Sequence, residues 1–170
     1  TDGSVISFKQ NVPILSDSES ILNSIRYRQY HSFSENIIGA FKFYGAAINT
    51  LGDEDVRLSK RLHLPSRRLR GFEKRKVGPL DQGDYVGGNY VSALNLEAQL
   101  PNLLPESTNT DVAGFLDFGN VWSADYDSSV GNSNKIRSAI GVTTQLWTPI
   151  GPVNFVLAQP LSKKESDKTQ

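Results

Sequence analysis

The chain has 170 residues, and its 18 basic and 18 acidic side chains leave no formal net charge at pH 7. This balance gives no indication of nucleic-acid binding, and the absence of cysteine excludes disulfides and thiolate metal sites. The two histidines lie far apart in sequence and cannot form a metal site alone, so we expect neither a metal nor a cofactor.

No run of about 18 apolar residues occurs, so no transmembrane helix is predicted. A transmembrane β-strand is a different case, because it needs only about 9–11 residues with apolar side chains at alternate positions. The mean hydropathy of −0.36 is compatible with such strands, since every second residue of each strand faces water.

The first part of the chain alternates between apolar and polar side chains, and Gly, Pro, Asn and Ser interrupt the alternation. The pattern predicts strands over residues 5–13, 21–33 and 37–49, separated by polar connections at 16–20 and 34–36. These strands are longer than the 5–6 residues or so that are usual in soluble proteins.

Residues 50–88 form a long connection, and a loop of this length in a compact domain is usually functional or disordered. We predict an ordered inserted loop, because apolar residues that can anchor it recur along its length. They are Val56, Leu58, Leu62, Leu64, Leu69, Phe72, Val77 and Leu80.

Four more alternating runs follow, at residues 89–100, 111–122, 136–148 and 153–161. With the first three they predict seven strands in an up-and-down antiparallel order. Short and long connections alternate along the chain, which is typical of an outer-membrane β-barrel. The predicted fold is therefore an all-β, partial transmembrane barrel, and a soluble β-sandwich or lipocalin-like barrel is the alternative.

The centre of the long loop carries a distinctive stretch. Pro65 fixes its own backbone, Gly71 frees the backbone beside Arg70, and Phe72 supplies an apolar anchor. A guanidinium held on such a bend suits docking onto carboxylates, although a basic loop is more often simply solvated. Alternation places two candidate partners, Glu97 and Asp117, on the face of their strands opposite the apolar one.

These residues resemble a known family. Leu69, Arg70, Gly71 and Phe72 are similar to the Arg-Gly-Phe/Tyr motif in the sixth extracellular loop of the BamA family of outer-membrane assembly proteins, which more often has Val before the Arg. From about Leu58 onward, further stretches match the C-terminal barrel of that family in order. They are residues 87–89, 96–97, 115–122, 149–153 and 158–160.

The resemblance implies that residues 1–170 are the C-terminal part of an outer-membrane barrel, with the POTRA domains, the early strands and the last strand absent. It implies that the loop folds into the barrel and that Arg70 contacts Glu97 and Asp117. The function implied is folding and insertion of β-barrel proteins into the bacterial outer membrane, without enzymatic chemistry. The implied partners are unfolded outer-membrane proteins, accessory lipoproteins, the lipid bilayer and lipopolysaccharide, with no nucleic acid.

Several alternatives stay open. A secretion channel of the same superfamily would share the loop motif, and a soluble β-sandwich would be a binding module. Glu97 and Asp117 could be the two catalytic carboxylates of a glycosidase, but any two acidic residues would fit that description equally well. The glycine-rich residues 83–88 lack the lysine and the following helix of a phosphate loop. The loop also carries a basic run, which comprises Arg67, Arg68, Lys74, Arg75 and Lys76. A run of this kind is usually a solvated surface, and contact with lipopolysaccharide is the alternative interpretation.

Overall fold

The computed structural model describes residues 2–13, 20–101, 103–105, 108–130 and 135–170. Most of the predicted connection at 16–20, and parts of those at 101–110 and 123–135, lie outside the described residues.

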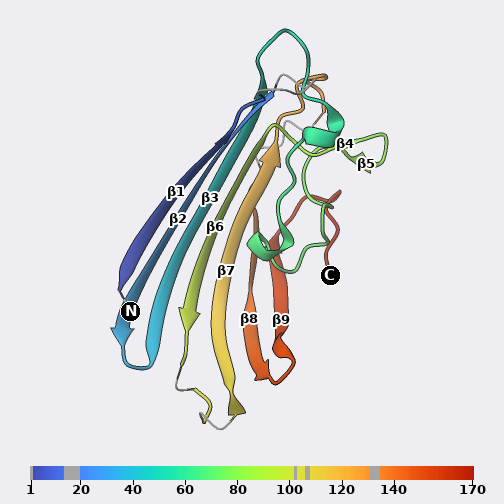
Figure 1. Cartoon of the computed structure of the whole chain (residues 1–170). Coiled ribbons are helices and arrows are strands. Elements are labelled where there is room, and N and C mark those ends of the chain that lie inside the picture. The colour runs from blue at the N-terminus through green and yellow to red at the C-terminus, as the bar shows by residue number, and fades with distance from the viewer. Residues whose placement is uncertain (1, 14–19, 102, 106–107, 131–134) are drawn as a thin grey trace.

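One sheet of seven strands forms the body of the molecule, in the order β1-β2-β3-β6-β7-β8-β9 (Figure 1). All pairs are antiparallel. The strands are β1 (Gly3–Asn11), β2 (Ser20–Ser34), β3 (Ile37–Thr50), β6 (Tyr90–Gln99), β7 (Thr110–Trp122), β8 (Arg137–Thr148) and β9 (Gly151–Ser162). The prediction of an all-β, up-and-down, partial barrel is confirmed, and the barrel is not closed.

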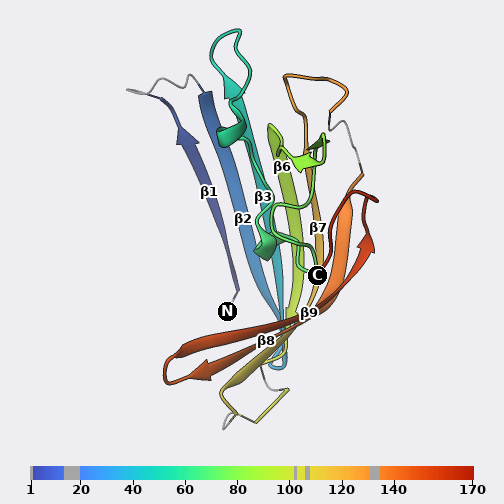
Figure 2. The same ribbon diagram turned by 90° about the vertical axis from the view of Figure 1, so that its right-hand side faces the viewer.

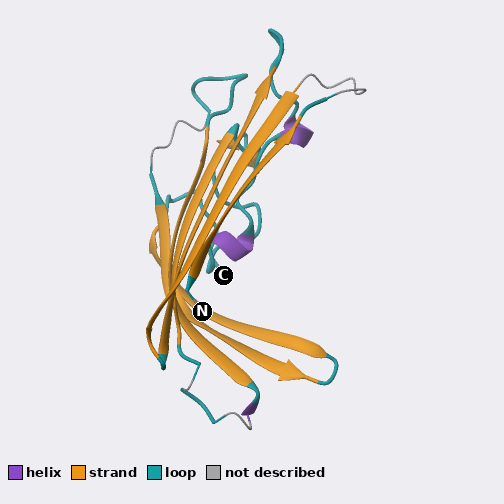
Figure 3. Cartoon of the chain, turned by 60° about the vertical axis from the view of Figure 1, so that its left-hand side comes forward, coloured by secondary structure: helices purple, strands orange, loops and turns teal. Residues whose placement is uncertain are grey.

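The sheet is strongly curved, and β8 and β9 sweep across it in their lower halves (Figure 2). The inserted loop lies on the concave side (Figure 3). Within the described residues, no helix is long and apolar enough to cross a membrane.

The two faces of the sheet differ in chemistry, as the alternation predicts. The side chains of Phe8 and Leu157, on the convex face, are 67% and 79% exposed although they are apolar. On the concave face, Asn95 and Asp117 are buried and pair with each other across β6 and β7. An apolar convex wall and a polar concave wall are what a membrane-spanning barrel requires.

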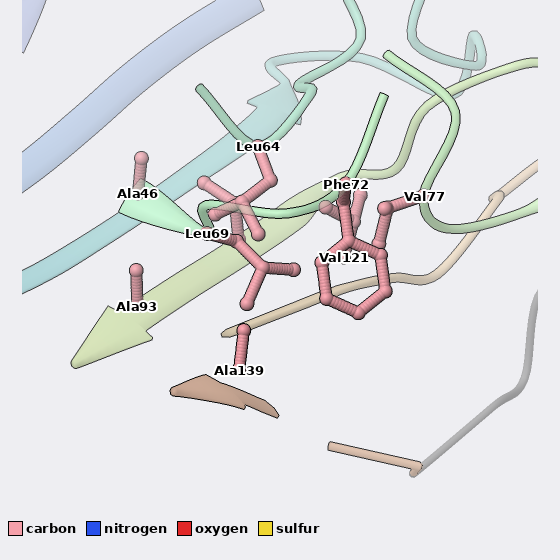
Figure 4. Packing of buried hydrophobic residues seen from close by; sticks show 9 residues of the cluster. Ala46, Leu64, Leu69, Phe72, Val77, Ala93, Val121 and Ala139 are labelled. Atoms are coloured by element: carbon pink, nitrogen blue, oxygen red, sulfur yellow. The ribbon is translucent and has the colours of Figure 1, made fainter. Parts of the chain in front are cut away.

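Apolar side chains of the inserted loop pack on the inner wall (Figure 4). The wall offers small residues there, and a Cβ added at Gly119 would lie 2.6 Å from Leu64, so the glycine makes room for the loop. The cluster comprises Leu64, Leu69, Phe72 and Val77 of the loop with Ala46, Val91, Ala93, Val121 and Ala139 of the wall. Burial of this cluster attaches the loop to β3, β6, β7 and β8.

The loop itself contains little regular structure. Two single-turn 3₁₀ helices, η1 (Leu58–Lys60) and η2 (Ser66–Arg68), precede a small hairpin of β4 (Leu80–Asp81) and β5 (Asp84–Tyr85). These elements are too short to produce a periodic sequence pattern, and none was predicted individually.

The C-terminal segment after β9 is a loop that lies against the inserted loop. Residues 163–170 return to the concave side, where Thr169 forms a β-bridge with Phe72. The backbone N–H of Glu73 donates to the Lys168 carbonyl at 3.0 Å, and that of Gln170 donates to the Gly71 carbonyl at 3.1 Å. The segment therefore holds the loop motif by main-chain hydrogen bonds. Bonds of this kind cannot be predicted from the side chains of the sequence.

Candidate functional site in the concave wall

The guanidinium of Arg70 lies between the two carboxylates. Its Nε donates to Asp117 Oδ2 at 2.7 Å and its Nη2 donates to Asp117 Oδ1 at 2.6 Å, which is a bidentate pair. The same Nη2 donates to Glu97 Oε1 at 3.0 Å, and the backbone N–H of Arg70 donates to Asp117 Oδ2 at 3.1 Å. The side chain of Asp117 is fully buried, so this ion pair is shielded from water.

Neighbouring side chains complete the cluster. Asn95 Nδ2 donates to Asp117 Oδ1 and to the Arg68 carbonyl, both at 2.8 Å, so one amide joins the wall to the loop. Lys42 forms a salt bridge with Glu97, and two cations therefore face two carboxylates. The ring of Phe115 lies under the guanidinium, 3.6 Å from Arg70 Cζ to the ring centre.

The electrostatics of the loop keep Arg70 charged. Burial lowers the pKa of Arg70, but the hydrogen bonds and negative charges of Asp117 and Glu97 outweigh this effect and raise the pKa above its ordinary value. Because both carboxylates accept from one guanidinium, they do not form the free acid–base pair that a glycosidase needs. In the described part of the chain, no group of three or more His, Asp or Glu side chains could hold a metal ion.

The backbone of the motif explains how Arg70 reaches the wall. Leu69 and Phe72 are each only 2% exposed and anchor the motif on both sides of Arg70. Between them Gly71 has φ of +83°, a left-handed conformation that costs other residues about 1–2 kcal/mol. A Cβ at Gly71 would also lie 2.9 Å from the Cβ of Ala158, so no larger residue fits without displacement.

Replacing Gly71 by alanine is expected to weaken docking of the loop, because the strain and the contact with Ala158 add together. We expect a loss of about 1–3 kcal/mol in local stability. Hydrogen exchange of the amides at residues 64–73 measures it. Gly83→Ala is the matched control, since φ is +93° there but nothing lies within 4 Å of the added Cβ. Unchanged exchange in Gly71→Ala would contradict the expectation.

A second buried ion pair joins β8 to the C-terminal segment. Arg137 Nε donates to Asp167 Oδ2 at 2.8 Å and Arg137 Nη2 donates to Asp167 Oδ1 at 3.0 Å, with both side chains fully buried. Arg137 also hydrogen-bonds to Asn120 and to the Lys135 carbonyl. No role was predicted for either residue from the sequence, because nothing there distinguishes Asp167 from the charged residues around it.

A third cluster fixes the start of the loop. Arg61, whose side chain is 2% exposed, forms a salt bridge with Asp125 and donates to the Val56 carbonyl at 3.0 Å. Burial alone would raise the pKa of Asp125, but hydrogen bonds from Val56 N–H and Asn89 and the charge of Arg61 lower it below its usual value. This cluster was not predicted from the sequence, because Asp125 lies 64 positions after Arg61, in a different connection.

A curved antiparallel sheet with an apolar outer face, a polar inner face and a loop docked inside is a segment of a bacterial outer-membrane β-barrel. The family model described as "Omp85 superfamily domain" matches residues 1–170. The chain belongs to the Omp85 superfamily and is part of a protein of the bacterial outer membrane.

Curated relatives carry the name outer membrane protein assembly factor BamA. The protein of Nitratidesulfovibrio vulgaris is 24% identical over 156 residues, covering 89% of this chain and 19% of the relative. That of Neorickettsia risticii is 29% identical over 105 residues, covering 60% of this chain and 14% of the relative. The chain thus spans less than a fifth of the length of either relative.

Among solved structures, the chain is similar to BamA from Haemophilus ducreyi lacking POTRA domains 1–3. The two are 24% identical, with a TM-score of 0.84. The match covers 99% of this chain and 37% of the other, which supports the fold.

Proposed function

We propose that the protein containing this chain folds and inserts other β-barrel proteins into the bacterial outer membrane. The observation that carries the proposal is the match of the whole chain to the Omp85 superfamily together with relatives named as assembly factors. Residues 1–170 would then form consecutive strands in the C-terminal half of a larger barrel, with residues 50–88 as its inserted extracellular loop.

The proposed role of Leu69, Arg70, Gly71 and Phe72 is to stabilise the interior of the barrel through Asp117 and Glu97. A rigid interior would support a seam at which the barrel opens. An unfolded substrate would pair with the exposed strand edge by main-chain hydrogen bonds, which requires neither a cofactor nor catalysis. Accessory lipoproteins, the lipid bilayer and lipopolysaccharide are the further partners proposed.

Two other functions fit less well. A secretion channel of the same superfamily would share the loop motif, but the curated relatives reported above are named as assembly factors. A soluble sandwich would need two sheets packed face to face, whereas the seven long strands of the described chain form one continuous sheet.

Depletion of the full-length protein in its native host tests the proposal. Folded barrel proteins of many kinds should fall together in the outer membrane, and purified protein in liposomes should accelerate the folding of a urea-denatured barrel substrate. Folding is read from the changed gel mobility of unheated samples. Normal levels of other barrel proteins, with loss of one secreted partner, would instead establish the channel function.

A further inference from the structure

The basic residues of the inserted loop surround a pocket that the Arg70 cluster does not use. The pocket has a volume of about 280 Å³, and it is lined by His63, Leu64, Pro65, Ser66, Arg67, Lys74 and Arg75. Three of these side chains are cationic and one carries a hydroxyl, while none carries a carboxylate. The pocket is therefore a concentration of positive charge with hydrogen-bond donors.

The cations of this pocket differ from three other arginines of the concave side. Arg61, Arg70 and Arg137 each form an ion pair with an acidic side chain. Among the described residues, no carboxylate lies within salt-bridge distance of Arg67, Lys74 or Arg75. Three positive charges around a small pocket repel one another, and an anion would remove that repulsion.

Backbone contacts hold both sides of the pocket in place. On one side, the N–H of Arg68 donates to the Pro65 carbonyl at 2.8 Å. On the other, the N–H of Lys76 donates to the Glu73 carbonyl at 3.2 Å, and Glu73 is itself bonded to Lys168. The main chain that carries these side chains is thus ordered before any ligand arrives, which removes part of the entropic cost of binding.

Arg75 adds a conformational observation. It has φ of +62°, a left-handed conformation that costs a non-glycine residue about 1–2 kcal/mol. Strained residues of this kind persist where the surroundings hold them and often occur at ligand-binding positions. Burial, and then the charge of Arg75, lower the pKa of His63 below its usual value, so the positive field of Arg75 reaches the imidazole.

We propose that this pocket binds a phosphate group. Arginine presents a planar fork that matches phosphate oxygens, and lysine and serine add single donors. The volume lies below the range of about 300–1,000 Å³ that accommodates drug-sized ligands, so the occupant is a small anion or the terminal phosphate of a larger molecule. Free phosphates and lipid headgroups share this chemistry.

The test uses the full-length protein in detergent and inorganic pyrophosphate as the probe. Calorimetry should show saturable binding, and the NMR signals of the His63 imidazole should shift with the same dependence on concentration. Arg67→Gln and Arg75→Gln should each bind about ten-fold more weakly or worse, because each removes a charge-assisted hydrogen bond. Lys60→Gln is the matched control: it removes one exposed cation from the same loop outside the pocket, and affinity should not change.

A second arm distinguishes the source of the phosphate. Dihexanoyl phosphatidic acid, used below its micellar concentration, should compete with pyrophosphate if a lipid headgroup is the ligand, and should fail to compete if a free phosphate is. Binding that is absent, that is unaffected by both arginine substitutions, or that weakens equally in Lys60→Gln would overturn the proposal. The His63 signals of each variant without ligand show whether the loop is still folded, which separates lost binding from misfolding.

Discussion

Replacing Arg70 by alanine should free the inserted loop from the wall and impair the proposed assembly activity of the full-length protein. The substitution leaves Asp117 buried without its cationic partner, and breaking a buried ion pair in this way costs about 3–5 kcal/mol. Loop release is measured by protease cleavage within residues 50–88 and by hydrogen exchange at residues 64–73. Activity is measured by folding of a barrel substrate in liposomes.

Two variants separate charge from geometry. Arg70→Lys keeps the charge but lacks the planar fork, so an intermediate effect is expected. Arg70→Ala combined with Asp117→Asn removes the uncompensated charge and should recover part of the lost stability without restoring the bidentate contact. If Arg70→Ala alone were as protease-resistant and as active as the unchanged protein, the cluster would have no role in holding the loop.

Replacing Asp167 by alanine should destabilise the loop about as much as Arg70→Ala does, because it releases the C-terminal segment that lies against the loop motif. Arg137 would keep its contacts with Asn120 and the Lys135 carbonyl but would lose its only ion pair among the described residues. A loss of about 3–5 kcal/mol is expected, together with detachment of residues 163–170 from Phe72. The readouts are the temperature of unfolding and hydrogen exchange at Glu73 and Gln170, whose amides bond across this contact.

Glu165→Ala is the control for Asp167→Ala, because Glu165 belongs to the same segment and is exposed. Little change is expected there. Replacing both partners by apolar residues of similar volume, as in Arg137→Met with Asp167→Leu, should restore much of the stability. An Asp167→Ala protein that unfolds at the same temperature as Glu165→Ala would show that the buried pair does not fix the segment.

The strands could be predicted because their signal is repetitive. A period of two, maintained over ten or more residues and interrupted by turn residues, leaves few alternatives, and boundaries moved by only a few residues. The strand predicted at residues 5–13, for example, is Gly3–Asn11 in the structure. The same alternation placed Glu97 and Asp117 on the face opposite the apolar one, which gives the direction of each side chain but does not identify its partner.

The contacts of the loop depend on information of another kind. The pairing of Arg70 with Glu97 and Asp117 was expected from family resemblance, since residues separated by 27 and 47 positions carry no common period. The pairing of Arg137 with Asp167 had no such support. It depends on the path of residues 163–170, and that path is determined by main-chain hydrogen bonds to Gly71, Phe72 and Glu73. Such bonds cannot be predicted from the types of the side chains.

The bridge between Phe72 and Thr169 has a consequence for the order of folding. The motif in the loop is completed by residues that lie almost one hundred positions later in the chain. These main-chain contacts of the motif can therefore form only after β8 and β9 have brought residues 168–170 back to the concave side. Because closing so long a stretch of chain costs conformational entropy, we expect these contacts to form after the strands of the wall have paired.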